Sequence, residues 1–283
     1  METPTATNPI AGAAITIEGT LNFRGFGGYP STLRPKCSTR DGFIYRSGHL
    51  EEITPTGLEQ LRNLGITTII DLTNSGEKNA LFTDSPNESS HRGFKILSLP
   101  LAKKEFSVQQ LSEKYRRYLV EGEKAIAESY VKLLIEGHEV IRDILLLIRD
   151  NPDAGFLIHC SMGKDRTGIV FAILLSLAGV LEDLVAEEYS RSESSLQAVF
   201  PSIAAAIKKA ILPPLTDEEA MYRAGIVIKT DKEAMRLTLR TVEEKFGGTM
   251  KYLNECCGIS LENLSRIQDI LTHIHTQHTQ TEG

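Results

Sequence analysis

The stretch from His159 to Gly168 constrains this 283-residue chain more than any other part of it. It reads His-Cys-Ser-Met-Gly-Lys-Asp-Arg-Thr-Gly. An apolar run over 155–158 leads into the stretch, and a second apolar run over 169–175 follows it. The pattern predicts a buried strand, a tight loop and the first turn of a helix, which meet at the thiol of Cys160.

This loop has the features of an anion site. A loop wrapped around a helix N-terminus aims several backbone N–H groups at one point, where the helix dipole adds partial positive charge. Arg166, separated from Cys160 by five residues, adds a planar guanidinium that can bind two oxygens of one phosphate. The same field favours the thiolate of Cys160, which makes the sulfur a nucleophile near neutral pH. We therefore expect phosphate to be bound by Ser161, Met162, Gly163, Lys164 and Arg166.

Other side chains of the stretch have supporting roles in this interpretation. Thr167 can donate a hydrogen bond from its hydroxyl to the sulfur of Cys160. We expect His159 to orient the backbone of Cys160 rather than to move protons. For Lys164 two interpretations stay open: its ammonium contacts a second phosphate of the substrate, or it only raises the local positive potential.

The loop resembles the signature of the atypical tyrosine/serine protein phosphatases, a family of cysteine-dependent phosphatases of bacteria and fungi. Other stretches are similar to the family pattern as well, namely 22–30, 44–48, 69–73 and 246–253. The resemblance spans roughly residues 20 to 272. Two positions depart from it, because Gly25 stands where an Asp is usual and Thr73 where an Arg is usual.

The resemblance implies an α/β fold of the protein-tyrosine-phosphatase type, with a central, mostly parallel sheet flanked by helices and a helical C-terminal part. It also implies that no metal or organic cofactor takes part. Cys160 would form a cysteinyl-phosphate, and Asp165, inside the loop, would be the general acid. A bland alternative is that Asp165 only pairs with a cation and shapes the loop.

Three residues outside the loop are further candidates. Asp71, at the end of another expected strand, is the alternative general acid. Arg24 and Arg46 match motif positions of the family and could line the rim of the pocket. For Arg46 a structural ion pair is the competing interpretation.

The rest of the chain predicts a mixed α/β pattern. Strands are expected at 42–45, 66–72, 94–99 and 156–159. Helices are expected at 55–64, at 105–149 with breaks near 122 and 137, at 166–179, at 181–192, and over much of 201–272 with breaks at 213–214 and 247–248. We expect one phosphatase domain over 15–272, between a disordered tail at 1–14 and a polar tail at 273–283. Helices within 104–135 could cover the pocket as a lid.

Composition narrows the class of partner. The net charge of −6 argues against a nucleic-acid-binding protein, whose surface would be broadly basic. The sequence shows no signal peptide and no apolar run long enough to cross a membrane. Its four cysteines form no evident disulfide framework, and an exposed catalytic thiol suits a reducing compartment, so we expect a cytoplasmic protein. The histidines at 273, 275 and 278 lack accompanying ligands, and we expect no metal there.

The expected activity is hydrolysis of phosphomonoesters, most simply those of phosphotyrosine or phosphoserine in a protein. Hydrolysis of a small molecule, such as a phosphoinositide, an inositol phosphate or a biosynthetic phosphate ester, is the main alternative. A phosphate-binding module without turnover would usually have lost Cys160 or Arg166, and both are present. A sulfur-transfer enzyme also uses a loop cysteine, but it does not need the Gly-Lys-Asp-Arg-Thr-Gly run.

Overall fold

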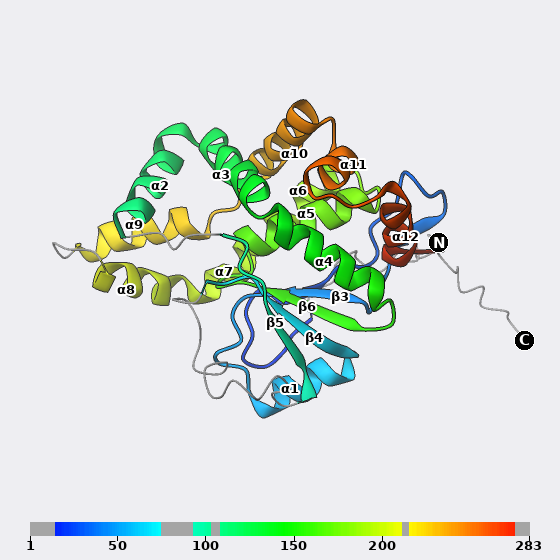
Figure 1. Ribbon diagram of the computed structural model, residues 1–283. Coiled ribbons are helices and arrows are strands. Elements are labelled where there is room, and N and C mark those ends of the chain that lie inside the picture. Colours follow the sequence, from blue (N-terminus) through cyan, green and yellow to red (C-terminus); the bar gives the residue numbers. More distant parts are fainter. Residues whose placement is uncertain (1–14, 75–92, 103–107, 211–214, 275–283) are drawn as a thin grey trace, which may run out of the picture.

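A computed structural model describes residues 15–74, 93–102, 108–210 and 215–274. Its centre is a five-stranded sheet in the order β1-β3-β6-β4-β5. The pairs β3–β6, β6–β4 and β4–β5 are parallel, and only β1 runs antiparallel, against β3. Figure 1 shows α1 on one side of this sheet and α4, α5, α6 and α10 on the other. The expected α/β architecture, with a mostly parallel sheet flanked by helices, is confirmed.

The strands of the central sheet are β1 (Arg24–Gly25), β3 (Ile44–Ser47), β4 (Ile66–Asp71), β5 (Lys95–Ser98) and β6 (Gly155–His159). A second, two-stranded sheet pairs β2 (Cys37–Thr39) with β7 (Thr272–Ile274). The helices of the first half are α1 (Pro55–Asn63), α2 (Val108–Glu121), α3 (Glu123–Glu136) and α4 (His138–Asp150). Those that follow are α5 (Asp165–Leu177), α6 (Glu182–Ser190), α7 (Ser192–Leu196), α8 (Phe200–Ala210), α9 (Asp217–Ile228), α10 (Lys232–Phe246), α11 (Thr249–Lys251) and α12 (Leu261–Leu271).

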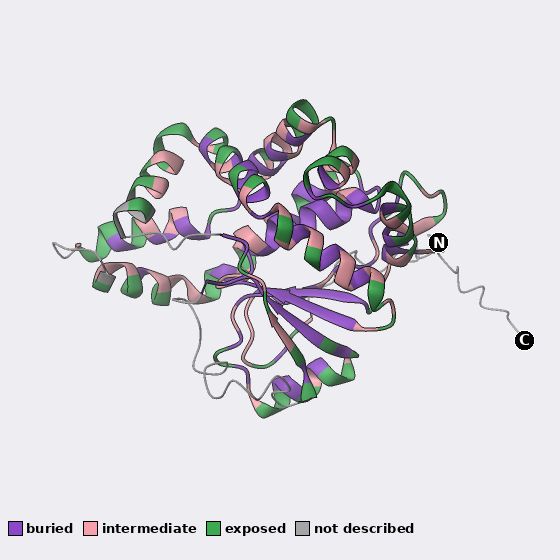
Figure 2. Ribbon diagram, in the orientation of Figure 1, coloured by how far each residue is buried: buried purple, intermediate pink, exposed green. Residues whose placement is uncertain are grey.

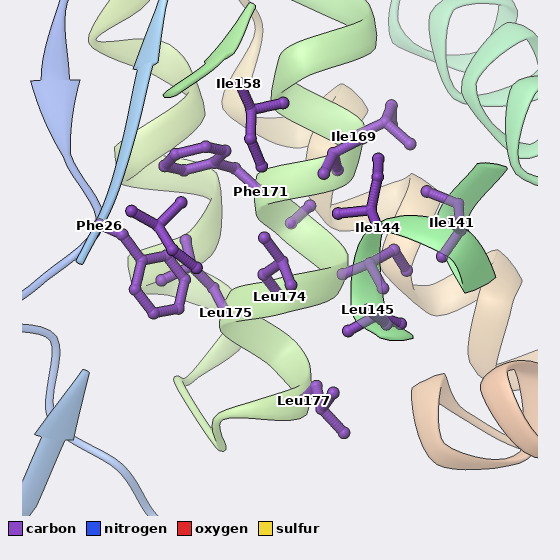
Figure 3. Close-up of a cluster of buried hydrophobic side chains, with 14 of the residues drawn as sticks. Phe26, Ile141, Ile144, Leu145, Ile158, Ile169, Phe171, Leu174, Leu175 and Leu177 are labelled. Atoms are coloured by element: carbon purple, nitrogen blue, oxygen red, sulfur yellow. The ribbon is translucent and has the colours of Figure 1, made fainter. Parts of the chain in front are cut away.

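The sheet separates two apolar cores, as expected for strands whose side chains alternate between faces. Phe156 and Ile158 of β6 belong to the larger core, whereas Leu157 between them belongs to the smaller one. The larger core contains helix α5, ten of whose thirteen residues are buried (Figure 2). Figure 3 shows Ile169 of α5 beside Ile144 of α4. A helix buried on nearly all sides is rigidly placed, and α5 is the helix that follows the Cys160 loop.

Local signals explain most of the element boundaries. Thr54 caps α1 by accepting a hydrogen bond from the Gly57 N–H, and Pro55 follows as its first residue, where proline suits a helix. The expected breaks near 122 and 137 are confirmed, because they separate α2, α3 and α4. Helix α10 ends at Gly247, which adopts φ +74° in the left-handed region.

Two expected boundaries are wrong. The strand expected at 42–45 lies at Ile44–Ser47, so Arg46 is inside the strand rather than after it. The ordered fold also continues past residue 272, because β7 pairs its residues 272–274 with β2. The expected tail at 1–14, the break at 213–214 and most of the tail at 273–283 lie outside the described residues.

Replacement of Ile144 by Ala should lower the free energy of unfolding by about 2–5 kcal/mol, because truncating a buried side chain leaves a cavity. Ile144 is 1% exposed in the larger core. Ile135→Ala is the matched control on the neighbouring helix, since Ile135 is 48% exposed and should change stability by about 0.5 kcal/mol or less. Urea unfolding followed by circular dichroism measures both. Equal losses would contradict this assignment of the core.

Candidate active site

The Cys160 loop lies at the carboxyl edge of the parallel sheet. Ser47, His159 and Asp71 are the last residues of β3, β6 and β4, and they stand in register across the sheet. Cys160 follows His159 directly, and α5 begins five residues later at Asp165. This is where α/β proteins place ligands, between strand ends and a helix N-terminus.

The sulfur of Cys160 is less accessible than the sequence suggests. The expected exposed thiol is wrong, because Cys160 is only 3% exposed. Arg166, the second residue of α5, donates to the hydroxyl of Ser161 at 3.0 Å and lies 3.5 Å from the carbonyl of Leu72. The guanidinium therefore reaches across the mouth of the loop from the helix to the end of β4.

The loop is held from beneath by two side chains that bind its carbonyls. Asn22 donates from its amide nitrogen to the carbonyls of Met162 at 3.0 Å and Gly163 at 3.1 Å. Arg46 donates to the carbonyls of Gly163 at 2.5 Å and Lys164 at 3.3 Å. In a planar trans peptide the N–H points away from the preceding carbonyl. The N–H groups that follow these three carbonyls therefore face the opposite side, where an anion would bind.

A buried carboxylate on α6 fixes the arginines of this layer. Glu188 is 1% exposed and accepts from Arg24 at 2.7 Å and from Arg46 at 2.6 Å. Arg24 also donates to the backbone carbonyl of Glu188 and to the hydroxyl of Ser192, both at 3.0 Å. Burial by itself would raise the pKa of Glu188, but the two guanidiniums outweigh it and lower that pKa. Glu188 is therefore ionised in the folded protein.

Arg24 and Arg46 do not line the rim of the pocket. They are 3% and 0% exposed, so the structure places them under the loop, and the ion-pair interpretation of Arg46 is the one it supports. Glu188 and the contribution of Asn22 were missed by the sequence reasoning. A signal existed on α6, where Val185, Glu188 and Tyr189 share one helix face and are all buried. A carboxylate on an apolar face needs a buried cation, and Arg24 and Arg46 supply two.

Asp165 occupies the first turn of α5, where the helix dipole favours an anion. Its carboxylate oxygen Oδ1 accepts a hydrogen bond from the hydroxyl of Tyr130. Burial alone would raise the pKa of Asp165, but the positive charges of Lys164 and Lys114 outweigh it and lower that pKa, with help from Tyr130 and Arg166. Without a bound phosphate, the carboxyl is therefore ionised.

Lys164 is held by helix α9 instead of reaching freely toward the pocket. Its side chain is buried, and its ammonium donates to the carbonyl of Val227 at 2.5 Å and to that of Lys229 at 3.2 Å. It also lies 3.6 Å from Oδ1 of Asp165. The ammonium of Lys164 therefore adds positive charge beside the loop, as in the second interpretation, while its N–H donors bind carbonyls at the end of α9.

The remaining expected residues near the loop are Asp71, His159 and Thr167. Asp71 accepts at Oδ1 from the backbone and hydroxyl of Thr73, at 2.8 and 2.7 Å, and lies 4.0 Å from Nε2 of His159. Burial lowers the pKa of His159, which keeps the imidazole neutral. The hydroxyl of Thr167 is buried without a hydrogen-bond partner among the described residues, so its expected bond to the sulfur is not formed here.

Two glycines of the loop are required by close contacts. Gly163 has φ +63°, and a Cβ there would lie 2.3 Å from the carbonyl oxygen of Ser47. A Cβ on Gly168 would lie 3.1 Å from the ring of Tyr189 on α6. Gly163 therefore lets the loop descend onto β3, and Gly168 lets α6 approach α5.

The described residues contain neither a metal-binding cluster nor a membrane-spanning helix. No group of three or more His, Cys, Asp or Glu side chains in that part of the chain could hold a metal ion. Within the same ranges, no helix has the length and apolarity needed to cross a bilayer.

Replacement of Glu188 by Ala should lower the free energy of unfolding by about 3–5 kcal/mol, because it leaves two buried guanidiniums without their counter-charge. Glu187→Ala is the matched control, since the adjacent Glu187 makes an exposed ion pair with Lys232. Chemical unfolding at pH 7 measures both variants. Similar losses for the two would show that the buried network does not anchor the fold.

The same carboxylate gives a pH dependence. The folded-state pKa of Glu188 is below its ordinary value of 4.5, so its contribution to stability is present above pH 4.5 and is lost as the pH falls below it. Glu188→Gln should therefore lose less stability between pH 5 and pH 3 than the wild type. A parallel decline of the two would contradict this assignment.

Comparisons with known proteins show which family the chain belongs to. The chain is 25% identical over 283 residues to the triple specificity protein phosphatase PtpB of Mycobacterium tuberculosis, with 90% of this chain and 98% of that protein covered. It is also 25% identical over 242 residues to a putative tyrosine-protein phosphatase of Cupriavidus necator, with 80% and 78% covered. The core catalytic domain of the PP-IP phosphatase SIW14 from S. cerevisiae is 15% identical, with 70% of this chain and 87% of that chain covered and a TM-score of 0.31. A model of the tyrosine phosphatase family matches residues 15–273, and the chain therefore belongs to that family and is a phosphoric monoester hydrolase, as expected.

Proposed function

We propose that this phosphatase removes phosphate from tyrosine and serine side chains of proteins, with Cys160 as the nucleophile. The observation that carries the proposal is the loop itself. Cys160 and Arg166 stand at the N-terminus of α5, and carbonyls of the loop are bound from beneath by Asn22 and Arg46. The names of the two curated relatives, both protein phosphatases, support the choice of substrate.

In the first step the Cys160 thiolate attacks phosphorus. The S–P bond forms while the ester P–O bond breaks, and the electron pair of that bond leaves with the substrate oxygen. Asp165 gives its proton to this oxygen, so that an alcohol or phenol departs. Arg166 and the loop amides, at Ser161, Met162, Gly163 and Lys164 among others, stabilise the charge on the phosphoryl oxygens.

In the second step water attacks the cysteinyl-phosphate. Asp165, now a carboxylate, takes a proton from that water as the new P–O bond forms and the S–P bond breaks. The thiolate is restored and inorganic phosphate leaves. Asp165 enters the cycle protonated because the negative charge of a bound phosphate opposes the carboxylate beside it and raises its pKa.

The remaining expected residues act through Cys160, Asp165 and Arg166. His159 orients the backbone of Cys160, and its neutral ring next to Asp71 suits that role. Thr167 has an unused hydroxyl that can donate to the sulfur as it becomes the leaving group in the second step. The helices within 104–135, whose residues 104–107 lie outside the described ranges, are proposed as a cover of the pocket, since α2 contacts α9 and carries Lys114 toward Asp165.

A small phosphate ester is the second candidate substrate. The observation that favours it is Thr73, which stands where the family pattern has an arginine. Thr73 uses its hydroxyl to hold Asp71 at 2.7 Å. A neutral side chain replaces a cation near the strand ends, so the pocket need not select the same ester as its relatives.

The place of action proposed here is the cytoplasm. All four cysteines, at 37, 160, 256 and 257, are free thiols. A nucleophilic thiolate keeps its activity only where the surroundings are reducing.

Replacement of Cys160 by Ser should abolish turnover while the fold stays intact, because a hydroxyl is far less acidic than a thiol and remains protonated. Phosphate release is measured for wild type and variant on phosphotyrosine and phosphoserine peptides, phosphoinositides and small phosphate esters. Highest kcat/KM on the peptides supports the proposed substrate, and a preference for a small ester favours the second candidate. Vanadate-sensitive hydrolysis by purified Cys160→Ser would overturn the mechanism.

Replacement of Asp165 by Asn should slow the hydrolysis of each substrate in proportion to how much its leaving oxygen needs a proton. An alkyl phosphate, whose leaving oxygen is a strong base, should lose about 10²–10⁴-fold in kcat, the usual contribution of general acid catalysis. An activated aryl phosphate should lose much less. A uniform loss on both esters would give Asp165 a loop-shaping role, and Asp71→Asn would then be tested with the same pair of substrates.

A further inference from the structure

Behind Asp165 lies a chain of two tyrosine hydroxyls that the mechanism has not yet used. The hydroxyl of Tyr130 on α3 donates to Oδ1 of Asp165, and the hydroxyl of Tyr189 on α6 lies 2.7 Å from that of Tyr130. The two rings meet edge to face, with centroids 5.9 Å apart and planes at 80°. Tyr130 and Tyr189 are 0% and 1% exposed. Three helices, α3, α5 and α6, thus contribute one polar group each to a buried row.

The direction of the row follows from the carboxylate. An ionised carboxylate only accepts hydrogen bonds, so Tyr130 must donate to Asp165. The lone pairs of Tyr130 are then left to accept from Tyr189. Burial raises the pKa of both tyrosines well above the usual value, and both therefore remain neutral donors while the enzyme works.

We propose that Tyr130, supported by Tyr189, is a positioning residue that fixes the orientation of the Asp165 carboxyl for proton transfer at the Cys160 loop. The inference rests on the proposed role of Asp165. Tyr130 engages Oδ1, which leaves Oδ2 to carry the proton exchanged with the leaving oxygen and with water. A proton donor that is misplaced by about 1 Å can cost on the order of 10²-fold in rate, so a hydrogen bond that fixes the Asp165 carboxyl contributes directly to the rate.

Several charged or titratable groups face Asp165 from the helices around it. They are Lys164 and Arg166 of the loop and α5, Lys114 and Tyr118 of α2, Tyr130 of α3 and Tyr189 of α6. The cations and the Tyr130 hydrogen bond favour the carboxylate over the acid. Loss of the Tyr130 hydroxyl removes one of these stabilising contacts, so the pKa of Asp165 should rise in its absence.

Tyr130→Phe therefore has two expected effects. The kcat on an alkyl phosphate should fall by roughly 10–100-fold, and that on an activated aryl phosphate by about 3-fold or less, because only the first needs a well-aimed proton. In the pH profile of kcat/KM, the limb that disappears in Asp165→Asn should move to higher pH. Tyr189→Phe should show the same changes at smaller size, and it carries the prediction if Tyr130→Phe does not fold.

A matched control separates positioning from packing. Tyr252 is also a fully buried tyrosine, and its hydroxyl donates to the carbonyl of Leu134 at 2.7 Å instead of to the site. Tyr252→Phe should lower the unfolding temperature and leave the pH profile and the ratio of the two substrates unchanged. In the Asp165→Asn background, Tyr130→Phe should have little further effect on kcat.

The outcomes are distinct from those of the proposed function. Hydrolysis by Cys160→Ser would overturn the proposed mechanism as a whole. With Cys160→Ser inactive, an unchanged pH profile and substrate ratio in folded Tyr130→Phe would overturn this inference alone. An equal loss from Tyr130→Phe in the wild-type and Asp165→Asn backgrounds would also overturn it.

Discussion

The ion pairs of Glu188 with Arg24 and Arg46 are the interaction on which the site depends. A buried carboxylate is costly unless every lone pair finds a donor, and a buried guanidinium is costly unless its N–H groups find acceptors. Here Arg24 spreads its donors over Glu188, Ser192 and Asn22, and the two Nη groups of Arg46 donate to Glu188 and to the loop carbonyls. Among the described residues, the Nε–H of Arg46 has no acceptor. Such a network adds little net stability compared with an apolar core. It does tie the loop carbonyls of Gly163 and Lys164 to Glu188 of α6 through Arg46.

Helix α6 supports both the loop carbonyls and the Asp165 side chain. Glu188 reaches the carbonyls from beneath through Arg46, and the adjacent Tyr189 reaches Asp165 through Tyr130. Neighbouring residues of a helix point about 100° apart, so one helix can serve two partners that lie in different directions. Gly168 is the residue that lets α6 come close enough, because a side chain there would meet the ring of Tyr189. The last glycine of the loop motif is thus explained by packing instead of by a turn.

The sequence was sufficient for the parts of this structure that depend on neighbours in the chain. The Cys160 loop, the strand before it, helix α5 and the breaks at Gly122 and Gly137 all follow from local patterns, and the structure agrees with them. Contacts between residues that are far apart in the chain could not be predicted from it. Arg24 and Glu188 are 164 residues apart, and Tyr130 and Asp165 are 35 apart, so no spacing rule links them. The exposure expected for Cys160 failed for the same reason, because burial is set by what packs over a residue.

The network also explains how an acidic protein attracts a phosphate ester. The net charge of −6 repels anions at long range, so attraction must be created over a few ångströms. Binding of the carbonyls of Met162, Gly163 and Lys164 from below turns their partner N–H groups upward before any ligand arrives. Donors fixed in advance need no reorganisation when charge develops on the phosphoryl oxygens, and such preorganised stabilisation is usually the largest single contribution to catalysis. The negative charge of Glu188 is neutralised by Arg24 and Arg46 in the layer below, so it does not cancel this field. In the proposed mechanism the loop stays fixed, and Asp165, at the edge of the nest, is the group whose charge changes.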